Sequence, residues 1–386
     1  MPDGRETITV RILDGIGAAD PGQWDACAGP DNPFVRHAFL SALEESGSAV
    51  TGTGWQPVHL VALDAGGGMT GAAPMYAKSH SYGEYVFDHA WANAYERAGG
   101  RYYPKLQVAV PFTPVPGPRL LLRPGAGPDV AAALAEAMQR VARGNGLSSV
   151  HVTFPTEAEW RRLGEAGWLR RLGVQFHWEN RGYTCFDDFL GALNARKRKA
   201  VRKERKAVAD SGVRLHALTG DDIKPAHWDA FHRFYLETAD RKWGGGYLTR
   251  DFFHRLGATM ADSVVLILCE DGGDWVAGAL NLVGGDALYG RNWGSDGRYR
   301  FLHFEACYYR AIDIAIERGL RRVEAGAQGE HKIQRGYLPV PTYSAHWVPD
   351  PGFRRVLAAH LEQERAAMEE EIRLLAGDSP YRQADG

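Results

Sequence analysis

The same order of elements occurs twice in this chain. Each copy has two apolar runs around a short acidic, glycine-rich segment, a pattern that predicts two antiparallel strands joined by a tight turn. These segments are His59–Leu63, Asp64–Gly68 and Met69–Met75 in the first copy, and Val264–Cys269, Glu270–Asp274 and Trp275–Val283 in the second. An amphipathic helix (129–143 and 302–318), a glycine and a short strand follow in each copy. The sequence therefore predicts a duplicated strand–strand–helix–strand module.

The length of the chain fits two domains of about 150–200 residues each. Of its 386 residues, 45% are hydrophobic and 24% are charged, which is typical of a globular protein. With one module in each half, we predict an α/β (α+β) fold of two tandem mixed-sheet domains, residues 1–180 and 181–386. The second domain is expected to contain a basic helix at 187–210 and a C-terminal helix at 353–375.

Several classes of protein are disfavoured by the composition. The four cysteines are scattered without metal-ligand spacing, so neither a metal site nor a disulfide framework is expected. The N-terminus lacks the apolar region of a signal peptide, and no run of 18 apolar residues predicts a membrane span. A cytoplasmic setting is therefore expected. The net charge of −2 disfavours a DNA-binding surface, although it leaves room for a local basic patch.

Residues 79–116 form an aromatic-rich insert that has no counterpart in the second copy. Long inserts inside compact domains are usually functional or disordered, and disordered segments are poor in aromatic residues. Two interpretations remain open: a packed structural insert, or a wall of the substrate site. The candidate acceptor-binding residues are Tyr85, Asp88, His89, Trp91, Tyr103 and Lys105 in the insert, with Arg291 and Trp293 on the expected third strand of the second copy.

The basic helix concentrates positive charge. Residues 196–206 contain eight Lys or Arg residues and one Glu. On a helix, this run either contacts phosphate groups or forms a solvated surface. The candidate donor-binding residues here are Arg196, Arg198, Lys199 and Arg202.

The segment 326–335 follows a buried strand and is rich in polar side chains, among them Gln328. Loops at strand ends often carry sites, although a capping loop with surface charges would look similar. Glu330 or His331 is a candidate proton acceptor, and Lys332 and Arg335 are candidate ligands for a donor phosphate or a carboxylate.

Two further candidate catalytic residues lie near predicted elements. Glu305, at the start of the helix at 302–318, either accepts a proton or only complements the helix dipole. Tyr343, on an expected final strand, either protonates a leaving group or packs on the core.

The predicted order of strands and helix in a mixed sheet resembles the GNAT acyltransferase core, and two such cores in one chain resemble the Fem-type aminoacyltransferases. Specific segments resemble the FemAB-like peptidoglycan biosynthesis/recognition family of predicted N-acyltransferases. They are 193–203 (LNARKRKAVRK), 303–309 (HFEACYY), 324–332 (EAGAQGEHK), 335–339 (RGYLP), 83–88 (GEYVFD) and 102–105 (YYPK). The stretch 295–302 departs from the glycine-rich phosphate loop of GNAT enzymes that use coenzyme A, because it has one glycine and two arginines.

This resemblance implies an N-acyltransferase with tandem GNAT-like domains in a Fem-type arrangement. It implies transfer of an acyl or aminoacyl group from acyl-CoA or aminoacyl-tRNA, as co-substrate, to a primary amine of a small molecule or peptide. It implies no bound cofactor, and tRNA is a candidate partner. The alternative is a non-catalytic protein that recognises peptidoglycan precursors.

Overall fold

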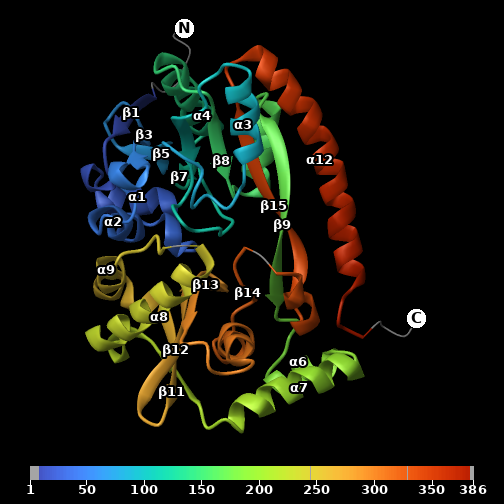
Figure 1. Cartoon of the computed structure of the whole chain (residues 1–386). Coiled ribbons are helices and arrows are strands. Elements are labelled where there is room, and N and C mark those ends of the chain that lie inside the picture. The colour runs from blue at the N-terminus through green and yellow to red at the C-terminus, as the bar shows by residue number, and fades with distance from the viewer. Residues whose placement is uncertain (1–7, 244, 328, 383–386) are drawn as a thin grey trace. The chain divides into compact units, whose positions relative to one another are not determined.

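The computed structural model describes residues 8–243, 245–327 and 329–382, and it divides them into two compact units (Figure 1). Unit 1 contains the described residues up to Gly173 together with Thr342–Glu369. Unit 2 contains Val174–Pro341 and the described residues from Glu370 onward. The units are thus interleaved in the sequence, whereas the predicted domains are two consecutive halves.

Unit 1 contains two sheets and the first copy of the module. An antiparallel sheet has the order β1-β3-β4-β7, and a mixed sheet has the order β15-β8-β6-β5-β2, in which only β6 and β8 pair in parallel. The strands are β1 (Thr9–Leu13), β2 (Trp55–Pro57), β3 (His59–Leu63), β4 (Met69–Ala73), β5 (Met75–Lys78), β6 (Lys105–Val108), β7 (Leu121–Leu122), β8 (Val150–Thr153) and β15 (Leu338–Trp347). The strands and turn predicted for the first copy are confirmed.

The helices of unit 1 are α1 (Pro21–Ala28), α2 (His37–Glu45), α3 (His89–Arg97), α4 (Pro128–Gly144) and α5 (Glu157–Glu165). The helix predicted at 129–143 is α4, whose apolar side packs in one core with β3, β6 and β8 through Leu134 and Met138. The insert at 79–116 is only partly separate from the sheet, because its residues 105–108 form β6 between β5 and β8.

Unit 2 contains one mixed sheet of order β10-β11-β12-β13-β14-β9, in which only β13 and β14 pair in parallel. Its strands are β9 (Leu169–Glu179), which begins in unit 1, β10 (Arg214–Leu218), β11 (Val264–Asp271), β12 (Asp274–Gly284), β13 (Ala287–Ser295) and β14 (Arg322–Glu324). The strands β11, β12 and β13 form the predicted antiparallel meander.

The helices of unit 2 are α6 (Phe186–Ala192), α7 (Ala195–Ala209), α8 (Pro225–Trp243), α9 (Arg250–Met260), α10 (Leu302–Phe304) and α11 (Arg310–Glu317), and α12 (Pro351–Gly377) runs from unit 1 into unit 2. The basic helix predicted at 187–210 is two helices. The break arises because Leu193 is buried in extended backbone and the side chain of Asn194 caps α7, accepting a hydrogen bond from the Lys197 amide at 3.0 Å.

Candidate functional site

Strands β13 and β14 separate after a short stretch of pairing. They pair only between Ala287–Tyr289 and Arg322–Glu324, although β13 continues to Ser295. Gly290 and Gly326 follow the last pair, and a Cβ atom added to Gly290 would lie 3.4 Å from the Glu324 carbonyl oxygen. We call this point the strand fork. Beyond it, the β13 backbone has no β14 neighbour to occupy its hydrogen-bonding groups.

The helix that follows β13 has an irregular first half. Phe301 precedes it with a left-handed backbone (φ 65°), α10 spans a single turn, and Glu305–Tyr309 forms a π-helical turn before α11. The sequence predicts one continuous helix at 302–318, and the structure instead places a π-helical turn inside it. Such turns are rare and are frequent at functional sites.

Lys332 is buried behind the fork. It lies in the 3₁₀ turn Glu330–Arg335, and its Nζ donates a hydrogen bond to the carbonyl of Gly326 at 3.0 Å. Burial lowers the pKa of this amine to about 8. At neutral pH the Lys332 amine is therefore mostly charged, and it is hydrogen-bonded to the backbone of Gly326 at the fork.

Arg335 is held by other side chains. Its guanidinium donates to both carboxylate oxygens of Glu204, at 3.2 and 2.8 Å, and stacks 3.5 Å from the centre of the Phe304 ring. The hydroxyl of Tyr309 donates to the same carboxylate. This geometry ties the Glu330–Arg335 turn to α7, so the charge of Arg335 is already neutralised within the protein.

Glu305 is also held in an ion-paired group. Arg205 of α7 donates to Glu305 at 3.1 Å and to Asp313 at 2.7 Å. Burial raises the pKa of Glu305 despite Arg205. Glu305 also raises the pKa of the buried Cys269 thiol, so its carboxylate faces α7 and the core beside β11.

A second carboxylate, Glu324, lies at the fork itself, as the last β14 residue that pairs with β13. It is 4% exposed, and one of its oxygens accepts a hydrogen bond from Arg322 Nε at 3.0 Å. The other oxygen, Oε2, accepts no hydrogen bond from any residue that the structure describes. The imidazole Nε2 of His177, on β9, is 3.8 Å from Oε2. Burial raises the pKa of Glu324 to about 7 and lowers that of His177 to about 3, so His177 is neutral.

Sequence reasoning missed Glu324 and His177 as candidate site residues. Glu324 ends the short strand predicted after the glycine of the second copy, which is a usable signal. His177 lies on a strand more than a hundred residues earlier and is brought to Glu324 only by the β9–β14 pairing.

The remaining candidates of unit 2 are more accessible. Glu330 and His331 are exposed, and the His331 ring is 3.0 Å from the Tyr308 hydroxyl. Gln328 lies outside the described residues.

Arg291 and Trp293, on β13, are half-buried, and the Trp293 ring contacts the ring of His303. On α7, Arg196, Lys199 and Arg202 are exposed and Arg198 is half-buried.

In unit 1, part of the insert packs on one face of the mixed sheet through a buried ionic group, which we call the Lys105 cluster: Ser81, Glu84, Asp88, Tyr102 and Lys105. Lys105 Nζ donates to Ser81 at 2.9 Å, to Glu84 at 2.7 Å and to Asp88 at 2.5 Å. The Tyr102 hydroxyl donates to Asp88 at 2.7 Å. Lys105 holds the pKa of Asp88 far below its usual range, so this pair is charged.

Two histidines and a second lysine continue this polar face. His151 of β8 and His346 of β15 share a ring-nitrogen contact of 2.7 Å, and burial lowers both pKa values, that of His151 to about 3. Lys78 of β5 is fully buried, lies 3.6 Å from the centre of the Trp55 ring and has a pKa lowered to about 7. Burial is the main cause of each shift.

The structure thus brings Asp88 and Lys105 together but closes them inside the protein. Trp91 is also buried, with its ring against His346, whereas His89 is exposed and Tyr85 and Tyr103 are half-buried. Tyr343 lies on a strand as predicted, in unit 1, and its ring packs on Trp160. The interpretation as a packed structural insert therefore fits the inner side of this segment.

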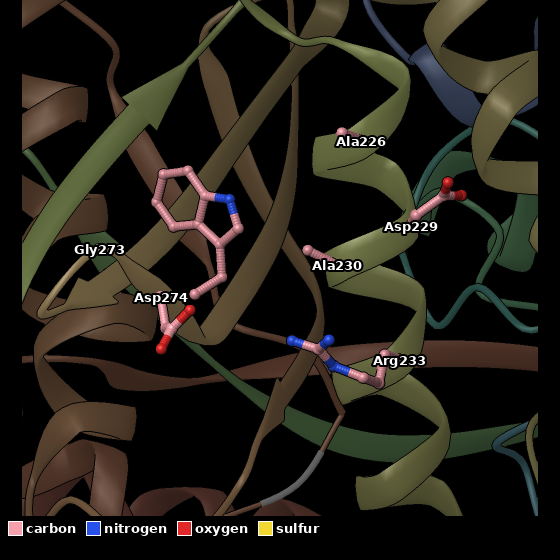
Figure 2. Close-up of a pocket in the computed structure, with 7 residues that line it drawn as sticks. Ala226, Asp229, Ala230, Arg233, Gly273 and Asp274 are labelled. Carbon is pink, nitrogen blue, oxygen red and sulfur yellow. The ribbon is translucent and has the colours of Figure 1, made fainter.

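Unit 2 also has a surface hollow, shown in Figure 2. It is lined by Ala226, Asp229, Ala230 and Arg233 on α8 and by Gly273, Asp274 and Trp275 at the start of β12. Asp229 pairs with Arg250 and His254, each at 2.7 Å. None of the residues predicted for the site lines it.

Comparison with known proteins gives a family. The chain matches the FemAB-like family, described as peptidoglycan biosynthesis/recognition, over residues 15–383. Because this match spans nearly the whole sequence, the chain belongs to that family. No curated protein matches the chain.

Solved structures share the fold at low identity. FemX is 11% identical, with a TM-score of 0.56 over 88% of this chain and 98% of its own. The C-terminal domain of a putative lysylphosphatidylglycerol synthetase from Agrobacterium fabrum is 11% identical, with a TM-score of 0.53 over 89% and 95%. L-PGS from Bacillus licheniformis is 11% identical, with a TM-score of 0.51 over 92% and 99%. The predicted tandem GNAT-like fold class is confirmed.

No helix in the described part of the chain is long and apolar enough to cross a membrane. Among the same residues, no three His, Cys, Asp or Glu side chains are grouped so that they could hold a metal ion.

Proposed function

We propose that this FemAB-like protein is an N-acyltransferase that moves an acyl or aminoacyl group to a primary amine at the strand fork of unit 2. The observation that carries this proposal is the fork, where β13 loses its β14 neighbour beside a buried ammonium group, Lys332, in a chain with the fold of FemX. Acyl transfer needs an extended site for the donor and a positive group near the carbonyl oxygen that becomes negative.

In this proposal, the edge of β13 that faces away from β12 binds the linear part of the donor beyond Gly290. The Lys332 ammonium stabilises the negative oxygen of the tetrahedral intermediate. The amine attacks the donor carbonyl directly, and no covalent intermediate forms on the protein.

The basic helix α7 bears on which activated donor the protein uses. The exposed Arg196, Lys199 and Arg202 on α7 would favour an aminoacyl-tRNA, because several phosphates can contact them. The loop at 295–302 also favours this donor, because its arginines are engaged locally: Arg298 pairs with Asp296 and Arg300 stacks 4.5 Å from the Phe301 ring centre. Acyl-CoA is the second donor under this proposal.

Calorimetric titration with acetyl-CoA, charged tRNA and uncharged tRNA, at low and high salt, tests the donor. We expect salt-sensitive binding of charged tRNA that weakens when Arg198 and Arg202 are replaced by Ala. Binding of acetyl-CoA alone would instead assign acyl-CoA as the donor. Binding of neither would favour the alternative, a non-catalytic protein that recognises peptidoglycan precursors.

A further inference from the structure

The reaction proposed above releases a proton from the attacking amine, and the inference here rests on that function. The four catalytic residues predicted from the sequence are poorly placed to accept it. Glu330 is exposed, Glu305 is paired with Arg205 on the α7 side, His331 contacts the Tyr308 hydroxyl, and the Tyr343 ring packs on Trp160. Among the described residues at the fork, Glu324 is a further carboxylate that can accept a proton.

We propose that Oε2 of Glu324 is the proton acceptor of the transfer reaction. The amine nitrogen forms a bond with the donor carbonyl carbon, and the N–H proton passes to Oε2. The bond between the carbonyl carbon and the leaving oxygen or sulfur then breaks, and its electron pair departs with the leaving group. Glu324 returns the proton to that group or to water.

The hydrogen bonding of Glu324 supports this role. A buried acceptor without a donor is rare in folded proteins and calls for an explanation. Arg322 occupies Oε1 at 3.0 Å and also pairs with Asp286, so the side of the carboxylate that bears Oε1 is fixed. Among the described residues Oε2 has no hydrogen-bond partner, and neutral His177 lies 3.8 Å from it. This leaves one lone-pair face of the carboxylate available for a substrate proton.

The position of Glu324 in the sheet also supports the role. It pairs with Tyr289 of β13 on one side and with His177 of β9 on the other, so three strands fix its backbone. Its carbonyl oxygen is the atom closest to Gly290, where the strands part. A proton acceptor on rigid strands beside the donor's expected path meets the geometric need of general-base catalysis.

The charges around Glu324 tune its proton affinity. Burial raises its pKa to about 7, and Asp286 adds to that rise, whereas Arg322 opposes it. Burial, followed by the charges of Arg322 and Lys332, lowers the pKa of His177 and keeps that ring neutral. A carboxyl that titrates near neutral pH is suited to accepting and releasing a proton in each cycle.

Glu305 is the rival acceptor, because its Oε2 also has no hydrogen-bond partner in the described part of the chain. Its surroundings differ from those of Glu324. Arg205 on α7 and Arg310 and Asp313 on α11 influence the pKa of Glu305. The charge of Glu305 in turn influences the pKa of Cys269 on β11. That environment fits a structural ion pair that locks α7 to the helix after the fork. The two carboxylates can be separated by experiment.

The test is the pH dependence of transfer by the full-length protein, with the donor that it binds and a primary-amine acceptor. We expect Glu324→Gln to lower kcat by about 100-fold or more and to remove the acid limb of the profile, while calorimetric donor binding changes by less than about threefold. Glu324→Asp should restore part of the rate and keep a shifted acid limb. Glu179→Gln, an exposed carboxylate on β9, is the matched control and should leave rate and profile unchanged.

A second measurement does not require activity. Infrared spectroscopy of the folded protein should show a protonated carboxyl that titrates near pH 7 and disappears in Glu324→Gln. Because Glu84 in the Lys105 cluster also has a pKa raised to about 7, Glu84→Gln identifies its separate contribution.

The outcomes distinguish the two proposals. If wild-type protein transfers the group and Glu324→Gln keeps its rate and acid limb, this inference is wrong and the transfer function stands. Loss of the acid limb in Glu305→Gln instead of Glu324→Gln would likewise overturn it. If wild-type protein binds a donor but transfers nothing to any amine, the transfer proposal and this inference both fail.

Discussion

At the scale of single residues, Lys78 is a buried amine whose surroundings oppose its charge. It lies between the Trp55 ring and the Tyr82 carbonyl, and its Nζ donates to that carbonyl at 3.1 Å. Burial lowers its pKa from 10.5 to about 7, with Glu84 and Asp88 acting in the opposite direction. Folding therefore either removes a proton from this lysine or buries its charge.

This shift predicts the pH dependence of stability. Between pH 7 and 10.5 the unfolded chain keeps the proton of Lys78 and the folded chain releases it, so its contribution to stability rises as the pH increases. In Lys78→Met that contribution is absent. Urea unfolding from pH 7 to 9.5 should show the free energy of unfolding of wild-type protein rising relative to Lys78→Met. Parallel curves would show that Lys78 has an ordinary pKa in the folded protein.

Gly294 illustrates a second constraint on a single residue, the contact between β13 and α8. A Cβ atom there would lie 2.2 Å from the carbonyl carbon of Phe234, a backbone atom that cannot rotate away. Gly294→Ala should lower the free energy of unfolding by about 3 kcal/mol or more. Gly191→Ala, in α6 where a Cβ meets nothing within 4 Å, should change it by less than about 1 kcal/mol. Equal effects in chemical denaturation would contradict the close approach of α8.

At the scale of elements, α7 has two different sides. Glu204 and Arg205 attach it to the turn and helix beside the fork, whereas Arg196, Lys199 and Arg202 face solvent. The sequence shows one run of charged residues on this helix. Their spacing alone does not indicate which of them form ion pairs with Arg335, Glu305 and Asp313.

The two sides of α7 predict that replacing two of its arginines lowers stability by very different amounts. Arg205→Gln removes the cation that is hydrogen-bonded to Glu305 and Asp313, leaving Arg310 at 3.9 Å from Asp313, and should cost about 2–4 kcal/mol of stability. Arg202→Gln loses only a 3.7 Å contact with exposed Asp187 and should cost less than about 0.5 kcal/mol. Because burial raises the pKa values of Glu305 and Asp313, acidification should reduce the Arg205→Gln defect. Equal denaturation midpoints at neutral pH would refute this assignment.

Elements that follow from local pattern were predicted well. The duplicated strand pairs, the helix at 129–143 and the C-terminal helix have clear periodicity and turn residues, and the structure contains all of them. Breaks that depend on single caps or backbone strain were missed, namely the interruption of the basic helix at Asn194 and the π-helical turn at Glu305.

The candidate site was less predictable than the fold, because burial and pairing across strands decide the state of each charge. Lys332 was predicted as a site residue from its position in a polar loop. The sequence does not reveal that its side chain is buried. Asp88 and Lys105, which are predicted to bind an acceptor, form a buried ion pair with each other. Glu324 and His177 become neighbours only through the β9–β14 register.

At the scale of the whole molecule, the chain leaves unit 1 after Gly173 and returns at Thr342. Residues 344–347 then pair with β8, where they cover a sheet edge. A fragment of residues 1–180 therefore lacks a strand of its own sheet, together with the partner of His151, His346.

This interleaving predicts which fragments of the chain fold. Residues 1–173 joined to 342–369 by a short glycine linker should fold, because a Cβ atom at Gly173 would lie 2.8 Å from the Thr342 hydroxyl and the two ends are therefore adjacent. Residues 1–180 alone should show poor amide dispersion in NMR and no cooperative unfolding. A well-folded 1–180 fragment would instead support two consecutive domains.

The central claim is that this FemAB-like protein transfers an acyl or aminoacyl group at the fork beside Lys332. The most direct measurement is transfer of a radiolabelled group from alanyl-tRNA or acetyl-CoA to a lysine-containing peptide, by wild-type protein and by Lys332→Met of equal thermal stability. We predict label on the peptide with wild-type protein and a rate at least about 100-fold lower with Lys332→Met. Equal rates for the two proteins, or no transfer from either donor, would contradict the claim.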